Sequence, residues 1–393
     1  MMDPSASKPL RILSVLNLDW NPHLGAARVY LELGEHWKAA GHTVEHFSFS
    51  EAFPRRHQSS REYALRRLMF PRRARAFIKA NHGRFDVIDA LAGSLAASKR
   101  DLKFDGLLVA RSVGSHWLYN EFDRDVAKRW PDQRPGTWAG RMFYGAVDRY
   151  LTSVCVAAVR HADLVNLPNT DEANDLRKRI GNLGPIIVQP YGLTSGQRGE
   201  LAVGNAQQRL GHKTICFVGM WGPRKGSRIW GEIMRRVRAR IQDAKFCFLG
   251  TMVSHDQVLR DVGDEFAADI QSIPEFAPAE LPKLLGRCAV GGFPSYVEGF
   301  GLALVEQLAA GVPTVAFDQG GPRDILGTAP DLLVPTGDVE AFAAALIRVL
   351  QLPGNEYERL QQRGVEIAAR YSWRSIADDT INDYRSLACK VGH

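Results

Sequence analysis

Glutamates and glycines that could bind a phosphorylated ligand gather in residues 293–308, which read F-P-S-Y-V-E-G-F-G-L-A-L-V-E-Q-L. The segment follows an apolar strand candidate and opens a helix near Gly301, so unpaired backbone N–H groups would point at a ligand in the loop. Gly299 and Gly301 would let the backbone approach that ligand closely. Glu306, about one turn into the helix, could accept hydrogen bonds from the vicinal diol of a ribose, and Glu298 could bind the hydroxyls of a sugar.

Two more glycine turns follow strand candidates in the same half of the chain. Residues 217–227, F-V-G-M-W-G-P-R-K-G-S, carry Arg224 and Lys225, whose charges could neutralise a diphosphate leaving group. Residues 317–325, F-D-Q-G-G-P-R-D-I, place a glycine pair before another helix. We expect the three glycine loops to converge on one crevice.

The elements that would position these loops alternate between short apolar strands and helical patterns. The strand candidates are 10–18, 43–49, 86–90, 106–110, 163–167 and 186–189, then 214–218, 245–249, 290–293, 314–317 and 332–334. This alternation predicts an α/β protein with two Rossmann-like, doubly wound parallel-sheet domains that face a cleft. Residues 192–213 hold few apolar side chains and are predicted to be the linker. Residues 373–387 predict an amphipathic helix.

Composition excludes several classes of protein. Of the 393 residues, 45% are hydrophobic and 24% charged, as in a globular protein and unlike a disordered or fibrous one. No stretch approaches the roughly 20 apolar residues of a bilayer span, so we expect neither a membrane helix nor a signal peptide. The five cysteines stand singly without C-x-x-C spacing, which argues against a disulfide framework or zinc site and favours a reducing cytoplasm.

Positive charge is concentrated between Arg55 and Arg84, where arginines alternate with apolar residues. The net charge of +7 predicts an anionic partner or substrate. An amphipathic surface in contact with anionic lipid headgroups would explain this segment, and a solvated helix pair or a subunit contact would explain it equally well. Nucleic acid is not expected as a partner, because the chain shows no recognition module or stacking platform.

One long motif carries a family resemblance. P-S-x-x-E-G-F-G-L-x-x-x-E-x-x-A-x-G-x-P, at residues 294–313, resembles the donor-site signature of the retaining family 4 glycosyltransferases of GT-B fold. Shorter matches are G-x-x-x-x-x-K-G at 219–226, G-G-P-R-D at 320–324, P-Y-G-L at 190–193 and Y-S-W at 371–373. The resemblance covers the second domain densely and the first loosely.

The resemblance implies a fold and an activity. Residues 1–195 would bind the acceptor, residues 196–373 would bind a nucleotide sugar, and a final helix at 374–390 would pack on the first domain. The enzyme would be a hexosyl- or glycosyltransferase of EC class 2.4 in polysaccharide or glycoconjugate biosynthesis, transferring sugar with retention, without metal or cofactor. UDP and GDP are the expected nucleotides. The acceptor would be a glycan, a lipid-linked sugar or a small molecule, met in the cytoplasm or at the inner membrane face.

The resemblance also implies roles for single residues. Glu306 would bind the ribose and Glu298 the donor sugar, while Lys225 and Arg224 would counter the diphosphate. We predict the catalytic group to be Glu298, His116, Lys225 and Arg224. The predicted donor-binding residues are Glu306, Gly299, Phe300, Gly301, Leu302, Gly219, Ser295 and Gly25, with the backbone N–H groups of Phe300, Gly301 and Leu302 on the phosphates.

The chain departs from the family pattern at four places. Met220 stands where the family usually has arginine, and Arg224 is the candidate replacement. Asp324 replaces a glutamate, one methylene longer. Gly25, followed by alanine, replaces a double glycine near the first strand, where a helix start could seat phosphate or acceptor. His116 comes a few residues late in R-S-V-G-S-H, so it could bind acceptor, handle a proton or be structural.

Two other functions remain open from the sequence. A non-catalytic binding or scaffold subunit of the same fold would explain the departures at Met220 and His116. A dinucleotide-dependent oxidoreductase is disfavoured, because the first strand leads into N-L-D-W-N-P-H-L-G-A-A and not into G-x-G-x-x-G. For Glu298 and Glu306 the alternative is a solvated loop and an exposed helix face.

Overall fold

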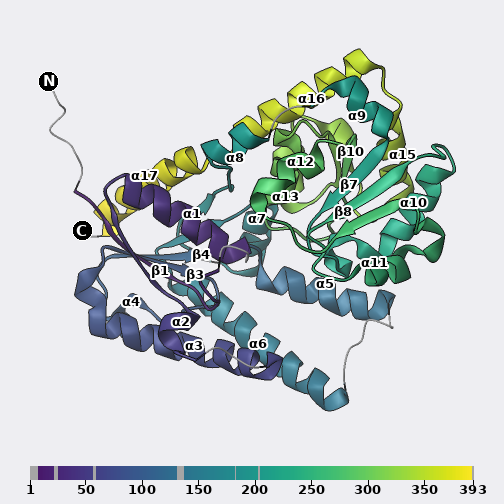
Figure 1. The fold of residues 1–393 in the computed structure, drawn as a ribbon. Coiled ribbons are helices and arrows are strands. Elements are labelled where there is room, and N and C mark those ends of the chain that lie inside the picture. The colour runs from purple at the N-terminus through teal and green to yellow at the C-terminus, as the bar shows by residue number, and fades with distance from the viewer. Residues whose placement is uncertain are drawn as a thin grey trace, which may run out of the picture. The chain divides into compact units, whose positions relative to one another are not determined.

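The chain folds into two compact units in the computed structural model (Figure 1). The structure describes residues 8–21, 25–55, 59–130, 137–181, 183–201 and 204–391. Unit 1 comprises Met1–Pro190 and Trp373–His393, and unit 2 comprises Tyr191–Ser372. The first break precedes the predicted boundary after residue 195, and the second lies where the chain enters its final helix.

Unit 1 is built on a six-stranded sheet in the order β2-β1-β3-β4-β5-β6, with every neighbouring pair parallel. The strands are β1 Arg11–Val15, β2 Thr43–Phe47, β3 Val87–Leu91, β4 Leu107–Arg111, β5 Leu164–Leu167 and β6 Ile186–Val188. All residues of β3, β4 and β5 are buried, because helices cover both faces of a parallel sheet.

The helices of unit 1 follow these strands as the sequence alternation predicts. They are α1 Gly25–Ala39, α2 Phe49–Ala52, α3 Ser60–Asn81, α4 Lys99–Leu102, α5 His116–Arg129, α6 Trp138–His161, α7 Thr170–Arg179 and α17 Trp373–Val391. In α1, Val29, Leu33 and Trp37 are buried at four-residue spacing, and the chain leaves the helix at Gly41 with a φ of 90°.

Helix α17 packs on α1 and β4 of unit 1. The Tyr384 hydroxyl lies 2.5 Å from Asp89 and accepts a hydrogen bond from Arg111 at 2.9 Å. Trp37 Nε1 donates to the Ala377 carbonyl of α17 at 3.1 Å. The apolar face predicted for the final segment is therefore buried, and hydrogen bonds fix its orientation.

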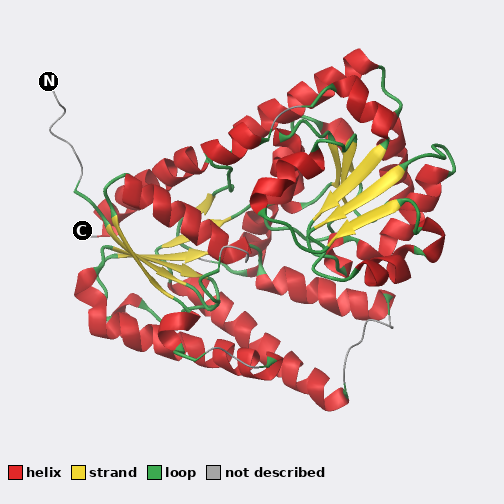
Figure 2. Cartoon of the chain, in the orientation of Figure 1, coloured by secondary structure: helices red, strands yellow, loops and turns green. Residues whose placement is uncertain are grey.

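Unit 2 is also built on six parallel strands, in the order β12-β11-β10-β7-β8-β9. The strands are β7 Thr214–Val218, β8 Lys245–Leu249, β9 Ile270–Ile273, β10 Val290–Phe293, β11 Thr314–Phe317 and β12 Leu333–Val334. The edge strand β9 was not among the sequence candidates, because I-Q-S-I is short and half polar. The prediction of two doubly wound parallel-sheet units is confirmed, and Figure 2 shows both sheets in yellow between red helices.

Nine α-helices surround the sheet of unit 2 in the part of the chain that the structure describes. They are α8 Ser195–Glu200, α9 Ala206–His212, α10 Trp230–Arg238, α11 His255–Val262, α12 Leu281–Leu285, α13 Leu302–Ala309, α14 Gly320–Leu326, α15 Val339–Leu350 and α16 Gly354–Ala369. Helix α10 packs with α11 and α15, whereas α13 packs with α16.

The linker predicted at 192–213 is wrong over most of its length, because it contains α8 and α9. Its polar residues are helix caps: Thr194 accepts from the Gln197 backbone N–H, and Asn205 from that of Gln208. Arg209 of α9 is buried, and its guanidinium donates to three backbone carbonyls of unit 2. Polar composition here reflects capping and a buried guanidinium.

Candidate functional site

The loops after β7 and β10 lie at the topological switch point of unit 2, where ligands bind in doubly wound sheets. The Tyr296 backbone N–H donates to the Arg224 carbonyl at 2.8 Å, which ties the two loops together. Gly226 has a φ of +83°, and a Cβ there would lie 2.5 Å from the Pro294 carbonyl oxygen. Only glycine fits this approach, so the lysine-bearing loop lies directly against the loop of Glu298.

The third glycine loop, after β11, contacts the β10 loop from the other side. A Cβ on Gly321 would lie 1.9 Å from the Phe300 carbonyl oxygen. Gln319 Nε2 donates to the Ser295 carbonyl at 3.1 Å. The three glycine loops therefore meet around residues 294–301, as the sequence predicts.

Lys225 and Glu298 form an ion pair between the first two loops. The side chains are 22% and 14% exposed, so the pair is largely shielded from water. Lys225 Nζ also lies 5.3 Å from the centroid of the Phe293 ring. The structure thus brings together two of the four predicted catalytic residues, which are 73 positions apart in the chain.

Helix α13 begins immediately after the glutamate loop. Gly301 is its N-cap with a φ of 106°, no side chain caps the helix, and its first turn contains no acidic residue. The N–H groups at such a helix start and the positive end of its dipole form a site for an anion. Glu306 lies one turn further along and is half-buried, close enough for a ligand to span both.

Ser295 contributes a buried hydroxyl to the β10 loop. Its side chain is fully buried, and among the described residues its Oγ has no hydrogen-bond partner. A buried polar atom without a partner calls for an explanation, and a bound ligand would supply one. The donor-binding role of Ser295 stays a prediction.

The remaining predicted residues of unit 2 surround this centre. Arg224 lies next to Lys225 in a 3-10 turn, Pro223–Lys225. Gly219 turns the chain after β7 with a φ of 146°, and the following Met220 is 60% exposed. Asp324 lies in α14, and its charge adds to burial in raising the pKa of Tyr371.

Tyr371 connects Asp324 with the glutamate loop, because its ring contacts the Phe300 ring at 5.2 Å between centroids. Asp324, whose side chain is one methylene shorter than that of glutamate, thus lies near a tyrosine that packs against the glutamate loop.

His116 and Gly25 belong to unit 1. His116 is the first residue of α5, and its Nε2 is buried without a hydrogen-bond partner among the described residues. Burial lowers the pKa of His116, and the charge of Arg67 lowers it further. Gly25 is the first residue of α1, after the switch-point strand β1, and a Cβ there would contact nothing within 4 Å.

Glu172, which sequence reasoning missed, holds the loop that leads to His116. Its carboxylate accepts hydrogen bonds from Ser115 Oγ at 2.5 Å, Ser112 Oγ at 3.3 Å and Asn169 Nδ2 at 3.2 Å. Burial raises the pKa of Glu172 to about 7. The available signal was the capping pattern N-T-D-E, in which Asn169 also accepts from the Glu172 backbone N–H.

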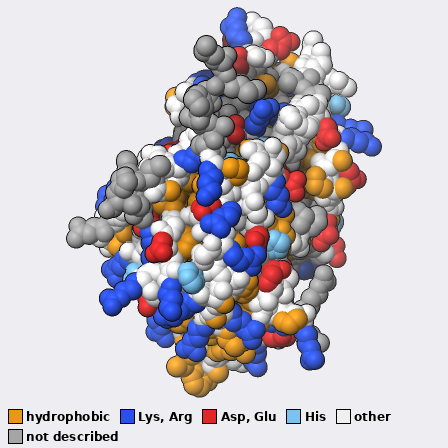
Figure 3. Space-filling view, turned by 90° about the vertical axis from the view of Figure 1, so that its left-hand side faces the viewer, with side chains coloured by type: hydrophobic (Ala, Val, Ile, Leu, Met, Phe, Trp, Pro, Cys, Tyr) orange, Lys and Arg blue, Asp and Glu red, His pale blue; other side chains and the backbone are white. Residues whose placement is uncertain are grey.

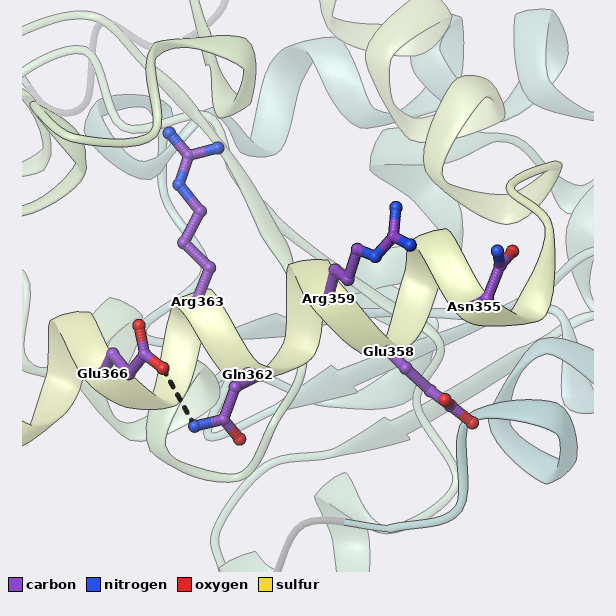
Figure 4. A pocket seen from close by; sticks show the side chains of 6 residues that line it. All are labelled: Asn355, Glu358, Arg359, Gln362, Arg363 and Glu366. Atoms are coloured by element: carbon purple, nitrogen blue, oxygen red, sulfur yellow. Dashed lines mark hydrogen bonds between the residues drawn. The ribbon is translucent and has the colours of Figure 1, made fainter.

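A hollow of about 430 Å³ on α16 is unrelated to these residues (Figure 4). Six side chains of that one helix line it: Asn355, Glu358, Arg359, Gln362, Arg363 and Glu366. No predicted site residue is among them. The described residues also contain no group of three His, Cys, Asp or Glu side chains able to hold a metal, so metal-independent chemistry stays a prediction.

Residues 212–352 match the family model described as glycosyl transferases group 1. Within unit 2, this segment is similar to the group 1 glycosyl transferases. The match contains all three glycine loops and both glutamates, and it confirms the family predicted from the 294–313 motif.

Two curated glycosyltransferases are similar to part of this chain. The D-inositol 3-phosphate glycosyltransferase of Mycobacteroides abscessus is 29% identical over 58% of this chain and 53% of its own length. The phosphatidyl-myo-inositol mannosyltransferase of Mycobacterium leprae is 30% identical over 46% of this chain and 48% of its own. The chain thus spans about half the length of these relatives.

Similarity to solved structures extends over the whole fold. Sucrose-phosphate synthase from Thermosynechococcus elongatus superimposes with a TM-score of 0.74 at 19% identity, over 96% of this chain and 99% of that one. Anabaena Alr3699/HepE, solved with UDP and glucose, gives 0.64 at 14% identity over 96% and 100%. At these identities the likeness establishes the shared GT-B fold.

Proposed function

We propose that this protein transfers a sugar from a nucleoside-diphosphate sugar to an acceptor hydroxyl, with retention of anomeric configuration. The observation that carries the proposal is the shielded Lys225–Glu298 pair, which lies at the switch point beside the uncapped start of α13. Glu306, one turn into that helix, completes a site with a cation, an anion seat and two carboxylates. The group 1 family match supports the same reaction class.

Each part of the donor has a matching group in this site. The diphosphate would bind the backbone N–H groups of Phe300, Gly301 and Leu302, where the helix dipole favours negative charge. Glu306 would accept hydrogen bonds from the two ribose hydroxyls. Ser295 Oγ lies in the same loop and would gain a partner on donor binding.

The ion pair between Lys225 and Glu298 gives donor binding a specific consequence. Lys225 Nζ donates a hydrogen bond to Glu298. A diphosphate with more negative charge would compete for the ammonium, and Glu298 would then be available to the hydroxyls of the sugar. One exchange of partners would thus orient both halves of the donor.

In the transfer step, the acceptor oxygen forms a bond to the anomeric carbon while the bond from that carbon to the diphosphate oxygen breaks. The acceptor proton passes to the departing diphosphate on the same face, which retains the configuration. Lys225 and Arg224 would stabilise the negative charge that develops on the leaving group. His116, on unit 1, would contribute to acceptor binding or proton handling.

The proposal also covers the nucleotide of the donor and the chemical class of the acceptor. UDP and GDP are the proposed nucleotides, and no further cofactor is required by the reaction. Unit 1 would bind the acceptor, a glycan, a lipid-linked sugar or a small molecule, at the cytoplasmic side.

Turnover of a panel of UDP-, GDP- and ADP-sugars tests the proposal, with Glu298→Ala and Glu306→Ala as variants. Glu358→Ala, on the exposed surface of α16, is the matched control. We expect wild type and Glu358→Ala to release nucleotide from one donor at equal rates, and Glu298→Ala to be slower by about 100-fold. Nucleotide binding without turnover in the wild type would favour a scaffold, and unchanged turnover in Glu298→Ala would contradict the site.

A further inference from the structure

The basic segment of the sequence forms one long helix of unit 1. Helix α3 carries seven arginine and lysine residues against the single acid Glu62, and it continues through Pro71. It packs on α6 through a small core of Ala64, Leu68, Phe143, Val147 and Leu151. The segment therefore forms one helix with a packed partner from a distant part of the chain, and the alternative of a solvated helix pair is wrong.

Large apolar side chains on α3 and α6 remain outside this core. Leu65 and Met69 of α3 are 47% and 45% exposed, and Trp138 and Met142 of α6 are 68% and 63% exposed. Each pair is four residues apart, so each forms a stripe along its helix. Figure 3 shows hydrophobic side chains at the foot of the view, bordered by lysine and arginine.

Arginines flank the apolar stripe of α3. Arg61 and Arg72 are one turn before Leu65 and one turn after Met69, and both are exposed. Within the described ranges neither has an ion-pair partner, whereas Arg66 pairs with Glu62 and Arg73 covers the Phe53 ring. No ion pair between the described residues uses the charge of Arg61 or Arg72. We name Arg61, Leu65, Met69, Arg72, Trp138 and Met142 the basic–apolar face.

We propose that the basic–apolar face docks on an anionic membrane surface. Apolar side chains would enter the headgroup boundary while arginines extend to lipid phosphates, the arrangement that interfacial helices adopt. Tryptophan is favoured at that depth. None of the described helices is long and apolar enough to span a bilayer, so the contact is one of surface docking.

Charge complementarity favours an anionic membrane surface over a second copy of the chain as the partner of the basic–apolar face. Helix α6 adds three arginines against the single acid Asp148, so both helices are strongly cationic. Two such faces would repel each other. An anionic lipid surface offers many negative charges together with an apolar layer, which match both features of the face. The proposal concerns unit 1 and stands apart from the donor chemistry of unit 2.

Flotation of the full-length protein with lipid vesicles tests docking. The vesicles contain phosphatidylcholine alone or with 30% phosphatidylglycerol, in about 0.1 M NaCl. We expect binding to the anionic vesicles only, and release in 0.5 M NaCl, since screening weakens contacts between exposed charges. The Arg61→Ala, Arg72→Ala double variant should bind about 30-fold more weakly, because each basic residue near such a surface contributes about fivefold.

The apolar half of the face is tested by the Trp138→Ser, Met142→Ser double variant, which should lose most vesicle binding. Both residues are exposed, so the fold should not change. Met252→Ser, at a methionine that is 58% exposed on unit 2, controls for loss of apolar surface, and Arg240→Ala, Arg359→Ala controls for loss of charge. Equal binding to neutral vesicles, no binding by the wild type, or unchanged binding by both face variants would overturn the proposal.

Discussion

The roles of Lys225 and Glu298 could be predicted from the sequence, whereas their contact with each other could not. Each was predicted separately, Lys225 as a partner of diphosphate and Glu298 as a partner of sugar. Their contact with each other could not be predicted, because 73 residues separate them and only the neighbouring positions of β7 and β10 bring them together. The unpartnered hydroxyl of Ser295 likewise became visible only with the packing around it.

Buried Glu172 makes the free energy of unfolding depend on pH in a way that an exposed glutamate would not. Its pKa is raised to about 7 in the folded state, above the ordinary value of 4.5, so the folded state holds its proton more tightly than the unfolded state. Its contribution to stability is fully present below about pH 4.5 and is lost as pH rises through about 7. We expect the free energy of unfolding to fall by about 2 kcal/mol from this group between pH 5 and pH 7.

Urea unfolding of wild type and Glu172→Gln at both pH values measures this effect. Glutamine cannot ionise, so the variant should lack the contribution of Glu172. Between pH 5 and pH 7 its free energy of unfolding should therefore fall by about 2 kcal/mol less than that of the wild type. Matching pH profiles in the two proteins would contradict the buried, proton-holding environment of Glu172.

Among the elements, helix α17 and its packing on unit 1 were predicted, whereas the hydrogen bonds that hold it there were not. The spacing of Ile376, Ile381 and Tyr384 predicts one apolar face, and all three residues are buried. The same face carries a polar network that periodicity cannot reveal, since its partners Asp89 and Arg111 lie in β3 and β4.

Tyr384→Phe should destabilise unit 1 by about 1–3 kcal/mol, because the buried carboxylate and guanidinium would each lose a hydrogen-bond partner. Urea unfolding followed by far-UV circular dichroism measures the change. Tyr150→Phe, on the surface of α6, removes a hydroxyl from a residue that is 36% exposed and should leave stability unchanged. Equal stabilities of the two variants would show that the network does not hold α17.

The elements that the sequence did not predict are β9, α8 and α9, and all three were missed for the same physical reason. The edge strand β9 needs few apolar residues because only one neighbour pairs with it. Helices α8 and α9 are short and polar, and they depend on caps and on buried Arg209 for their place in unit 2. Local hydrophobicity therefore predicted the central strands of both sheets and failed where tertiary contacts decide.

In the whole molecule, the two units have different strand orders, and each order contains one topological switch point. Unit 1 runs β2-β1-β3-β4-β5-β6, with a switch between β1 and β3, and unit 2 switches between β7 and β10. The alternation of strands and helices predicted two such sheets, and the glycine loops predicted the switch point of unit 2. Unit 1 has no comparably dense motif, and residues 22–24 before Gly25 lie outside the described residues. The acceptor side is consequently less defined by sequence than the donor side.

A crystal structure of the protein with its preferred nucleoside diphosphate would test the proposed donor site. We expect the diphosphate within hydrogen-bond distance of the Gly301 and Leu302 N–H groups, the ribose hydroxyls on Glu306, and Lys225 Nζ moved from Glu298 to a phosphate oxygen. A nucleotide bound elsewhere on unit 2, or a Lys225–Glu298 pair unchanged beside the bound diphosphate, would contradict it.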